Sequence, residues 1–224
     1  MYHYVEDKKF LSRMRSLCGE IMQDLCHCLN KKYDIGANVF LVGSGASNLI
    51  LQNESQPIDL DYNIEIVRCE DYEDCRFIKE CVIKAFNEVL CNHGWGDCKD
   101  SKSSLTTEKS YFTKGNPTGF SMDVCIVCRD TKGNFYRLIH EKTNVYNIMT
   151  GQHYDRYYWN KAFDSAKINE KAKYIKKMGE WGRVRKQYRD IKNRYLTQND
   201  QDHPSFICYI EAVNNVYNEI KNWK

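Results

Sequence analysis

Two short segments of the chain contain the residue types that phosphoryl chemistry uses. An apolar run ends in Gly43-Ser44-Gly45, and Asp59-Leu60-Asp61 lies in a second apolar run. A glycine turn after a strand exposes backbone N–H groups that favour an anion such as phosphate. Asp59 and Asp61 are two residues apart on a predicted strand, so their carboxylates project from one face, roughly 7 Å apart. These like charges favour a bound cation, and Mg²⁺ binds carboxylate and phosphate oxygens together.

A third carboxylate lies in a later strand-like run. Asp123 is the only charged residue in the segment 120–128. A buried carboxylate is costly without a partner, so Asp123 needs one. On a strand beside Asp59 and Asp61, it would complete the group of three acids that two-metal phosphoryl transfer uses. The sequence therefore predicts that Asp59, Asp61 and Asp123 form a catalytic site that binds Mg²⁺ or Mn²⁺.

The order of these segments resembles the DNA polymerase β-type nucleotidyltransferase superfamily, over residues 36–130. The resemblance implies a mixed β-sheet flanked by helices, with NTP and Mg²⁺ as ligands. It implies that Gly43 and Ser44 hold the triphosphate, that Asp59 and Asp61 ligate both metal ions, and that Asp123 ligates one and helps to deprotonate the acceptor. One departure concerns residues 46–48, which are Ala-Ser-Asn where many small members have an arginine. Other residues would then contact the triphosphate.

Composition limits the classes of protein to consider. The 224 residues, with 42% hydrophobic content, suffice for one large domain or two small ones with apolar cores. No apolar stretch approaches the roughly 20 residues that span a bilayer, and residues 1–9 lack the apolar core of a signal peptide. The 11 cysteines are irregularly spaced, which favours small apolar side chains in a reducing compartment over disulfides or zinc. We expect a cytoplasmic protein that does not enter the membrane.

Charge and periodicity divide the chain into two predicted domains. Residues 1–150 carry 18 Lys+Arg against 21 Asp+Glu, whereas residues 151–224 carry 15 against 9. We assign 1–150 to a nucleotidyltransferase-like core and 151–224 to a helical C-terminal domain. Within the core, apolar spacing predicts helices near 6–32 and 71–93, the second with Phe77 facing inward. A strand at 135–140 is expected to form a hairpin with the Asp123 strand.

The predicted C-terminal domain is basic. Apolar residues at helical spacing predict a helical region from 168 to 195, weakened near Gly179 and Gly182, and a last helix near 205–223. Met178 and Phe206 are predicted to face inward. Residues 167–194 contain 11 Lys+Arg against 3 Asp+Glu. Most of these charges suit a solvated helix face, but the side chains of Lys173, Lys176, Lys177 and Arg183 are candidates to face the acids and bind the triphosphate.

The sequence thus predicts an α+β protein with a nucleotidyltransferase-type mixed β-sheet flanked by helices, followed by a helical domain. The predicted activity is transfer of an NMP from an NTP, such as ATP, to an acceptor hydroxyl, with release of pyrophosphate. A small molecule, a protein, a nucleotide or an RNA end would each suit as acceptor. The alternative is a nucleotide- or RNA-binding regulator with little turnover, as in a toxin–antitoxin or phage-defence pair. The basic segment and 16 tyrosines suit RNA, because phosphates bind Lys and Arg while unpaired bases stack on aromatic rings.

Overall fold

The computed structural model describes residues 1–146, 148–151, 153–162, 166–199 and 205–222. Its contacts divide the chain into two compact units. The helical unit consists of Met1–Glu6, Gly43–Ile58 and Asp164–Lys224, and the sheet unit of Asp7–Val42 and Asp59–Phe163. The domain boundary at residue 150 remains a prediction. The two compact units differ from the two predicted domains, because two N-terminal segments pack with the C-terminal helices.

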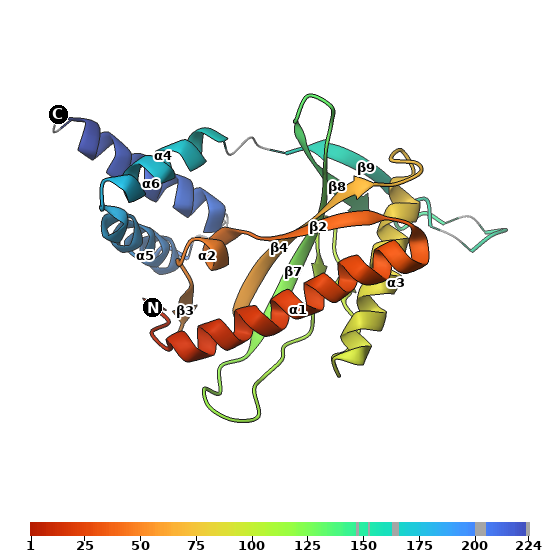
Figure 1. The fold of residues 1–224 in the computed structure, drawn as a ribbon, viewed down its shortest axis with the longest axis horizontal. Helices are drawn as coiled ribbons and strands as arrows, with labels where there is room; N and C mark the ends of the chain where they lie inside the picture. The colour runs from red at the N-terminus through yellow and green to blue at the C-terminus, as the bar shows by residue number, and fades with distance from the viewer. Residues whose placement is uncertain (147, 152, 163–165, 200–204, 223–224) are drawn as a thin grey trace. The chain divides into compact units, whose positions relative to one another are not determined.

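The sheet unit is built on a mixed β-sheet, as predicted (Figure 1). Its strands are β2 (Gly36–Leu41), β4 (Ile58–Arg68), β7 (Phe120–Arg129), β6 (Leu105–Thr106) and β5 (Lys99–Asp100) in spatial order, and β7 also pairs with β8 (Phe135–Glu141), which pairs with β9 (Arg156–Lys161). The pairs β2–β4, β6–β7, β7–β8 and β8–β9 are antiparallel. Between β4 and β7, Asp59 contacts Ser121 and Glu65 contacts Arg129. Because these contacts follow the same order along both strands, β4 and β7 run in the same direction.

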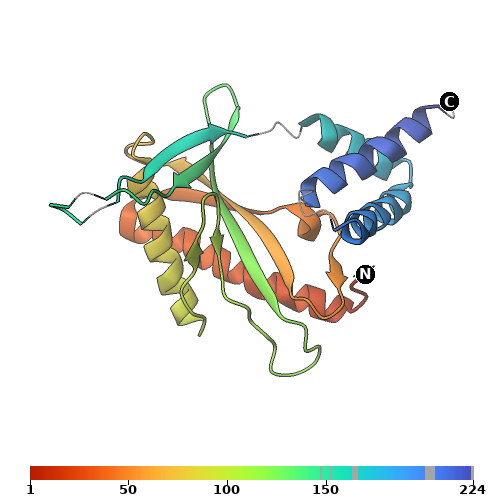
Figure 2. The same cartoon turned by 180° about the vertical axis from the view of Figure 1, so that it is seen from behind.

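Helices α1 (Lys8–Tyr33) and α3 (Cys75–Asn92) pack together on one face of this sheet (Figures 1 and 2). Each helix begins after an aspartate whose side chain accepts a backbone N–H three residues later, at 2.9 Å in both cases. Both helices confirm the sequence prediction. The inward position predicted for Phe77 is wrong. It lies in the first turn of α3, and 46% of it is exposed.

The helical unit contains α4 (Ala166–Lys177), α5 (Trp181–Thr197) and α6 (Ser205–Asn222), which surround an apolar core. The short helix α2 (Gly43–Ala46) and the antiparallel pair β1 (Tyr2–Tyr4) and β3 (Leu51–Asn53) belong to the same unit. Gly179 separates α4 from α5 with a φ of 76°, a conformation that glycine adopts readily. The predicted interruption is therefore confirmed.

The predicted last helix is also confirmed as far as residue 222, since residue 223 lies outside the described residues. The inward positions predicted for Met178 and Phe206 are wrong, with exposed fractions of 41% and 42%. Met178 directly follows α4, and Phe206 is the second residue of α6. At helix ends, fewer neighbouring side chains cover a residue than in the middle turns.

One strand lies within the segment that the sequence analysis gave to the helical domain. Residues 156–161 form β9, which is rich in aromatic residues that favour strands and pairs with β8 along its whole length. All 11 cysteines are free thiols. Among the helices that the structure describes, none combines the length and apolarity needed to cross a bilayer.

Candidate active site

The three predicted acids lie on neighbouring strands of the sheet unit and on its open face, opposite α1 and α3. On β4, Leu60, Tyr62 and Ile64 are buried, whereas Asp59 is exposed and Asp61 is half-buried. The cause is the alternation of side chains along a strand. Ser121 on β7 contacts Asp59 and therefore shares its face, and Asp123 follows two residues later on the same face.

Hydroxyl groups on neighbouring strands hold two of the acids. The Ser121 hydroxyl donates to Oδ1 of Asp59, and the Thr106 hydroxyl donates to Oδ1 of Asp123. Thr106 can do so because it is the direct partner of Asp123 in the β6–β7 register. Among the described residues, Oδ2 of each of these two carboxylates has no hydrogen-bond donor. Each acid therefore keeps one oxygen for a ligand.

The pKa of the Cys125 thiol, on β7, is affected by charged groups on the open face. Burial raises the pKa of its thiol, the Arg137 guanidinium lowers it, and the carboxylates of Asp61 and Asp123 raise it further. All three charged groups therefore lie close enough to act on one sulfur atom. Asp61 on β4 and Asp123 on β7 thus both lie near Cys125 on the open face, and their approach to a shared metal ion stays a prediction.

Arg137 is a candidate that the sequence analysis missed. It pairs with Val127 in the β7–β8 register, two residues from Cys125, and therefore belongs to the open face. Its Nε is buried without a hydrogen-bond partner, and its guanidinium forms no ion pair with any described residue. Within the strand segment 135–140 it is the only Arg or Lys. That isolated cation in an otherwise apolar and aromatic strand is the signal that could have identified it.

The chemistry of the acids suits a divalent cation. Carboxylate oxygens are hard ligands of the kind that Mg²⁺ and Mn²⁺ prefer. The described part of the chain has no group of three or more His, Cys, Asp or Glu side chains placed to hold one ion. Asp59 and Asp123 instead turn toward Ser121 and Thr106. The donor set fits the metal, and convergence of all three carboxylates on it remains a prediction.

The glycine turn lies in the helical unit. Gly43, the first residue of α2, has a φ of 61°, which favours glycine, and this single turn of helix ends at Ala46. The predicted order of strand, turn and helix start is therefore confirmed. Val42, the residue before Gly43, donates its N–H to the carbonyl oxygen of Asp61 at 2.8 Å. The turn thus begins one peptide bond beyond a residue that is held to the acid-bearing strand.

Of the predicted triphosphate-binding lysines, Lys176 is connected to this turn. Its Nζ lies 4.5 Å from the centre of the Trp181 ring, and Trp181 Nε1 donates to the carbonyl oxygen of Ser47 at 3.3 Å. Lys173 and Lys177 are exposed on α4 and form no ion pair with a described residue. The side chain of Arg183 is bound to Glu219 and lies 3.8 Å from Glu180, so its charge is already paired.

Comparison with known proteins identifies the fold. No model of a protein family matches the sequence, and no curated protein is significantly similar to it. Among solved structures, CdnC from E. coli MS115-1 with ATP has a TM-score of 0.55 at 14% identity, over 93% of this chain and 61% of that one. The CD-NTase CdnG from Bradyrhizobium diazoefficiens with GTP has a TM-score of 0.51 at 13% identity, over 90% and 65%.

DncV from Vibrio cholerae, a cyclic AMP-GMP synthase, has a TM-score of 0.52 at 10% identity, over 84% of this chain and 61% of that one. The chain thus spans less than two thirds of the length of these structures. CD-NTases belong to the DNA polymerase β-type superfamily. The fold implied by the sequence resemblance is therefore confirmed, and the chain has the nucleotidyltransferase fold.

Proposed function

We propose that the protein is a Mg²⁺- or Mn²⁺-dependent nucleotidyltransferase that moves an NMP from an NTP to an acceptor hydroxyl and releases pyrophosphate. The observation that carries this proposal is the position of Asp59, Asp61 and Asp123 on adjacent strands, on the open face of a nucleotidyltransferase-type sheet. The NTPs bound to CdnC and CdnG support an NTP as the ligand of this fold.

Each acid has a proposed role. Asp59 and Asp61 would hold both metal ions, and Asp123 would hold one and accept the proton of the acceptor hydroxyl. When bound, the metal ions would neutralise the leaving pyrophosphate and make the acceptor oxygen more acidic. Thr106 and Ser121 position the carboxylates, because each hydroxyl fixes one oxygen and leaves the other for a ligand.

The anionic substrate also needs cations and N–H groups. We propose that Gly43, Ser44, Lys173, Lys176 and Lys177 bind the triphosphate. The contact of Lys176 with Trp181, and of Trp181 with Ser47, supports this role. Arg137 would supply a further cation on the open face, where a guanidinium can bind phosphate oxygens in pairs. It would compensate for the arginine that residues 46–48 lack.

The test is transfer of label from each α-³²P-labelled NTP in Mg²⁺ or Mn²⁺, first with the protein alone and then with cell lysate as a source of acceptors. We expect labelled product with wild type and none with Asp61→Asn or Asp123→Asn. Equal labelling by wild type and variants would contradict the proposed site. Tight NTP binding without transfer to any acceptor would instead favour the nucleotide- or RNA-binding regulator.

A further inference from the structure

A basic hollow lies on the helical unit between α4 and α6. It has a volume of about 320 Å³, which is near the lower end of the range for small-ligand sites. Its lining consists of Lys167, Glu170, Lys171, Tyr174 and Tyr217. None of these residues belongs to the proposed transferase site, so the hollow needs its own explanation.

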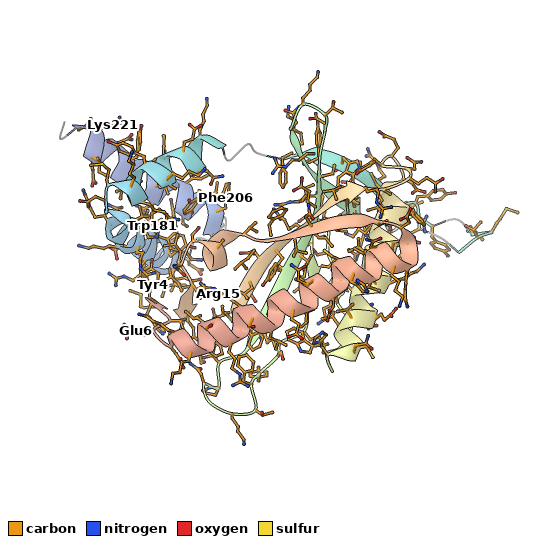
Figure 3. All side chains as sticks on the ribbon, in the orientation of Figure 1. Tyr4, Glu6, Arg15, Trp181, Phe206 and Lys221 are labelled. Atoms are coloured by element: carbon orange, nitrogen blue, oxygen red, sulfur yellow. The ribbon has the colours of Figure 1, made fainter. Side chains whose placement is uncertain are left out.

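Aromatic rings, rather than acids, hold the ammonium groups at this hollow. Lys171 Nζ lies 5.2 Å from the centre of the Tyr217 ring and donates to Oδ1 of Asn214 at 2.7 Å. Lys221, on the last turns of α6 (Figure 3), places its Nζ 4.9 Å from the Tyr174 ring and 5.7 Å from the Tyr217 ring. Such cation–π contacts orient the charges without neutralising them.

The hollow has more positive than negative charge. Lys167, Lys171 and Lys221 form no ion pair within the described residues, and Glu170 is the one acid in the lining. Elsewhere in the same unit, Arg194 is paired with Glu211, with Nη2 at 2.8 Å from Oε1. The lining thus holds two lysines against one acid, and Lys221 adds a third cation beside the same rings, so the local potential is positive and attracts an anion.

The rings narrow the class of anion. The centres of the Tyr174 and Tyr217 rings are 5.5 Å apart, with the planes at 69°. Lysine side chains are flexible and can move from a ring to a phosphate, which frees the ring face for a planar group. Inorganic phosphate or an acidic peptide would use the lysines but not the rings. A nucleotide uses both, because its phosphate binds lysine and its base stacks on an aromatic side chain.

We propose that the hollow between α4 and α6 binds a nucleotide unit, with Lys171 and Lys221 on the phosphate and Tyr217 or Tyr174 against the base. The unit could come from single-stranded RNA or from a free nucleotide. The site uses neither the three acids nor a metal ion. Its binding can therefore be measured in EDTA, separately from nucleotidyl transfer.

The first test compares two double variants that each remove two positive charges. Lys171→Gln with Lys221→Gln changes the hollow. Lys8→Gln with Lys186→Gln removes exposed lysines that lie outside it. Binding of a fluorescent 12-nucleotide oligouridylate is followed by anisotropy in EDTA at several salt concentrations. We expect the hollow variant to lose about tenfold or more in affinity, with the log–log salt slope reduced by about 0.7 for the one phosphate that both lysines contact. The control should change less than twofold.

The second test concerns the ring. Tyr217→Phe keeps the stacking surface and should bind like wild type, whereas Tyr217→Leu should lose about fivefold or more in affinity because it lacks the ring. Circular dichroism verifies that both variants are folded. Unlabelled ATP, unlabelled oligouridylate and inorganic polyphosphate are then used as competitors. Displacement by ATP identifies the free nucleotide as a ligand, and displacement by oligouridylate alone identifies RNA.

The proposal is overturned if wild type binds neither RNA nor ATP in EDTA at about 50 mM salt, where phosphate contacts are strong. Equal affinities of the two double variants would also overturn it. So would unchanged binding by Tyr217→Leu together with full displacement by polyphosphate, because an anion site without base recognition would explain both results. Failure of nucleotidyl transfer would not affect any of these outcomes.

Discussion

The two faces of the sheet each carry a cluster of acids, and the clusters differ in whether the carboxylates are paired with cations. On the face covered by α1 and α3, Lys79, Asp100, His140 and Asp155 form a chain of contacts. Lys79 Nζ lies 2.7 Å from Oδ1 of Asp100, and His140 lies 2.6 Å from Asp100 and 2.8 Å from Asp155 through its two ring nitrogens. Lys79 and His140 are buried. In this network every carboxylate has a cationic or proton-donating partner within the fold.

On the open face, two of the acids have hydroxyl groups as partners instead of cations. Asp59 and Asp123 contact hydroxyl groups and form no ion pair with any residue that the structure describes. Burying a charge is costly unless it is paired, so the covered face needs its partners to fold. Carboxylates that face solvent can remain without an ion-pair partner in the fold and so can bind a ligand. The comparison therefore assigns stability to the covered cluster and chemistry to the open one.

The largest expected effect is on catalysis. Asp123→Asn should reduce nucleotidyl transfer by about a thousandfold or more, equivalent to about 4 kcal/mol of barrier, because it removes a metal ligand and the proposed base. The midpoint of thermal unfolding should stay the same or rise, because one of several like charges is removed. Transfer rates and unfolding curves measured on the same preparations check both parts. A large loss of stability would contradict this prediction and indicate that Asp123 mainly stabilises the fold.

The covered cluster should behave in the opposite way. Lys79→Met should lower the free energy of unfolding by about 3 kcal/mol or more, because it leaves Asp100 partly buried without its main cation. Urea unfolding measures this change. Lys84→Met, on the same helix, is the control and should change stability little. Nucleotidyl transfer per folded molecule should stay near the wild-type value. A loss of transfer without a loss of stability would contradict the assignment of the covered cluster to stability alone.

Arg137 should show a smaller effect than the acids. Arg137→Gln should raise the KM for the nucleotide by about tenfold, or 1.4 kcal/mol, because an unpaired guanidinium on the open face is lost. Arg137→Lys restores the charge but not the paired donors and should recover part of the loss. Steady-state transfer kinetics distinguish the two variants. If both match wild type, Arg137 does not contact substrate.

The smallest effect concerns acid pH at the covered cluster. The backbone N–H of Thr143 and the His140 side chain hold the pKa of Asp155 below its ordinary value of 3.8. A carboxyl with a lowered pKa in the folded state stabilises the fold above the ordinary value and loses that contribution as pH falls through the lowered pKa. Wild type should therefore be more stable than Asp155→Asn at pH 7, and the difference should shrink below pH 4. Thermal midpoints at both pH values test this sign.

Local patterns predicted the open face better than the covered one. The two-residue period of β4 was enough to place Asp59 and Asp61 on one side of that strand. The side that Asp123 takes follows from the pairing of β4 with β7. The contact between Lys79 and Asp100 joins a helix to a short strand, and neither local segment specifies it. Arg137 was missed for the same reason, because its place near Cys125 depends on the β7–β8 register.

The grouping of 43–58 with the C-terminal helices also depends on tertiary contacts. Trp181 donates to the carbonyl oxygen of Ser47, and Leu49 lies in the core of the helical unit. Sequence periodicity identified the helices that surround this core. It did not show that an N-terminal segment completes it, because that requires packing between residues more than a hundred positions apart.

The most direct test of the central claim is a Mn²⁺ titration followed by electron paramagnetic resonance, in the presence of a non-hydrolysable ATP analogue. Wild type should bind Mn²⁺ in a nucleotide-dependent way. Asp61→Asn and Asp123→Asn should each weaken that binding by about tenfold or more, since each removes a carboxylate ligand. Asp24→Asn, which removes an acid paired with His93 elsewhere in the sheet unit, should bind like wild type. Equal Mn²⁺ affinity in wild type and both site variants would contradict the assignment of these acids as the metal site.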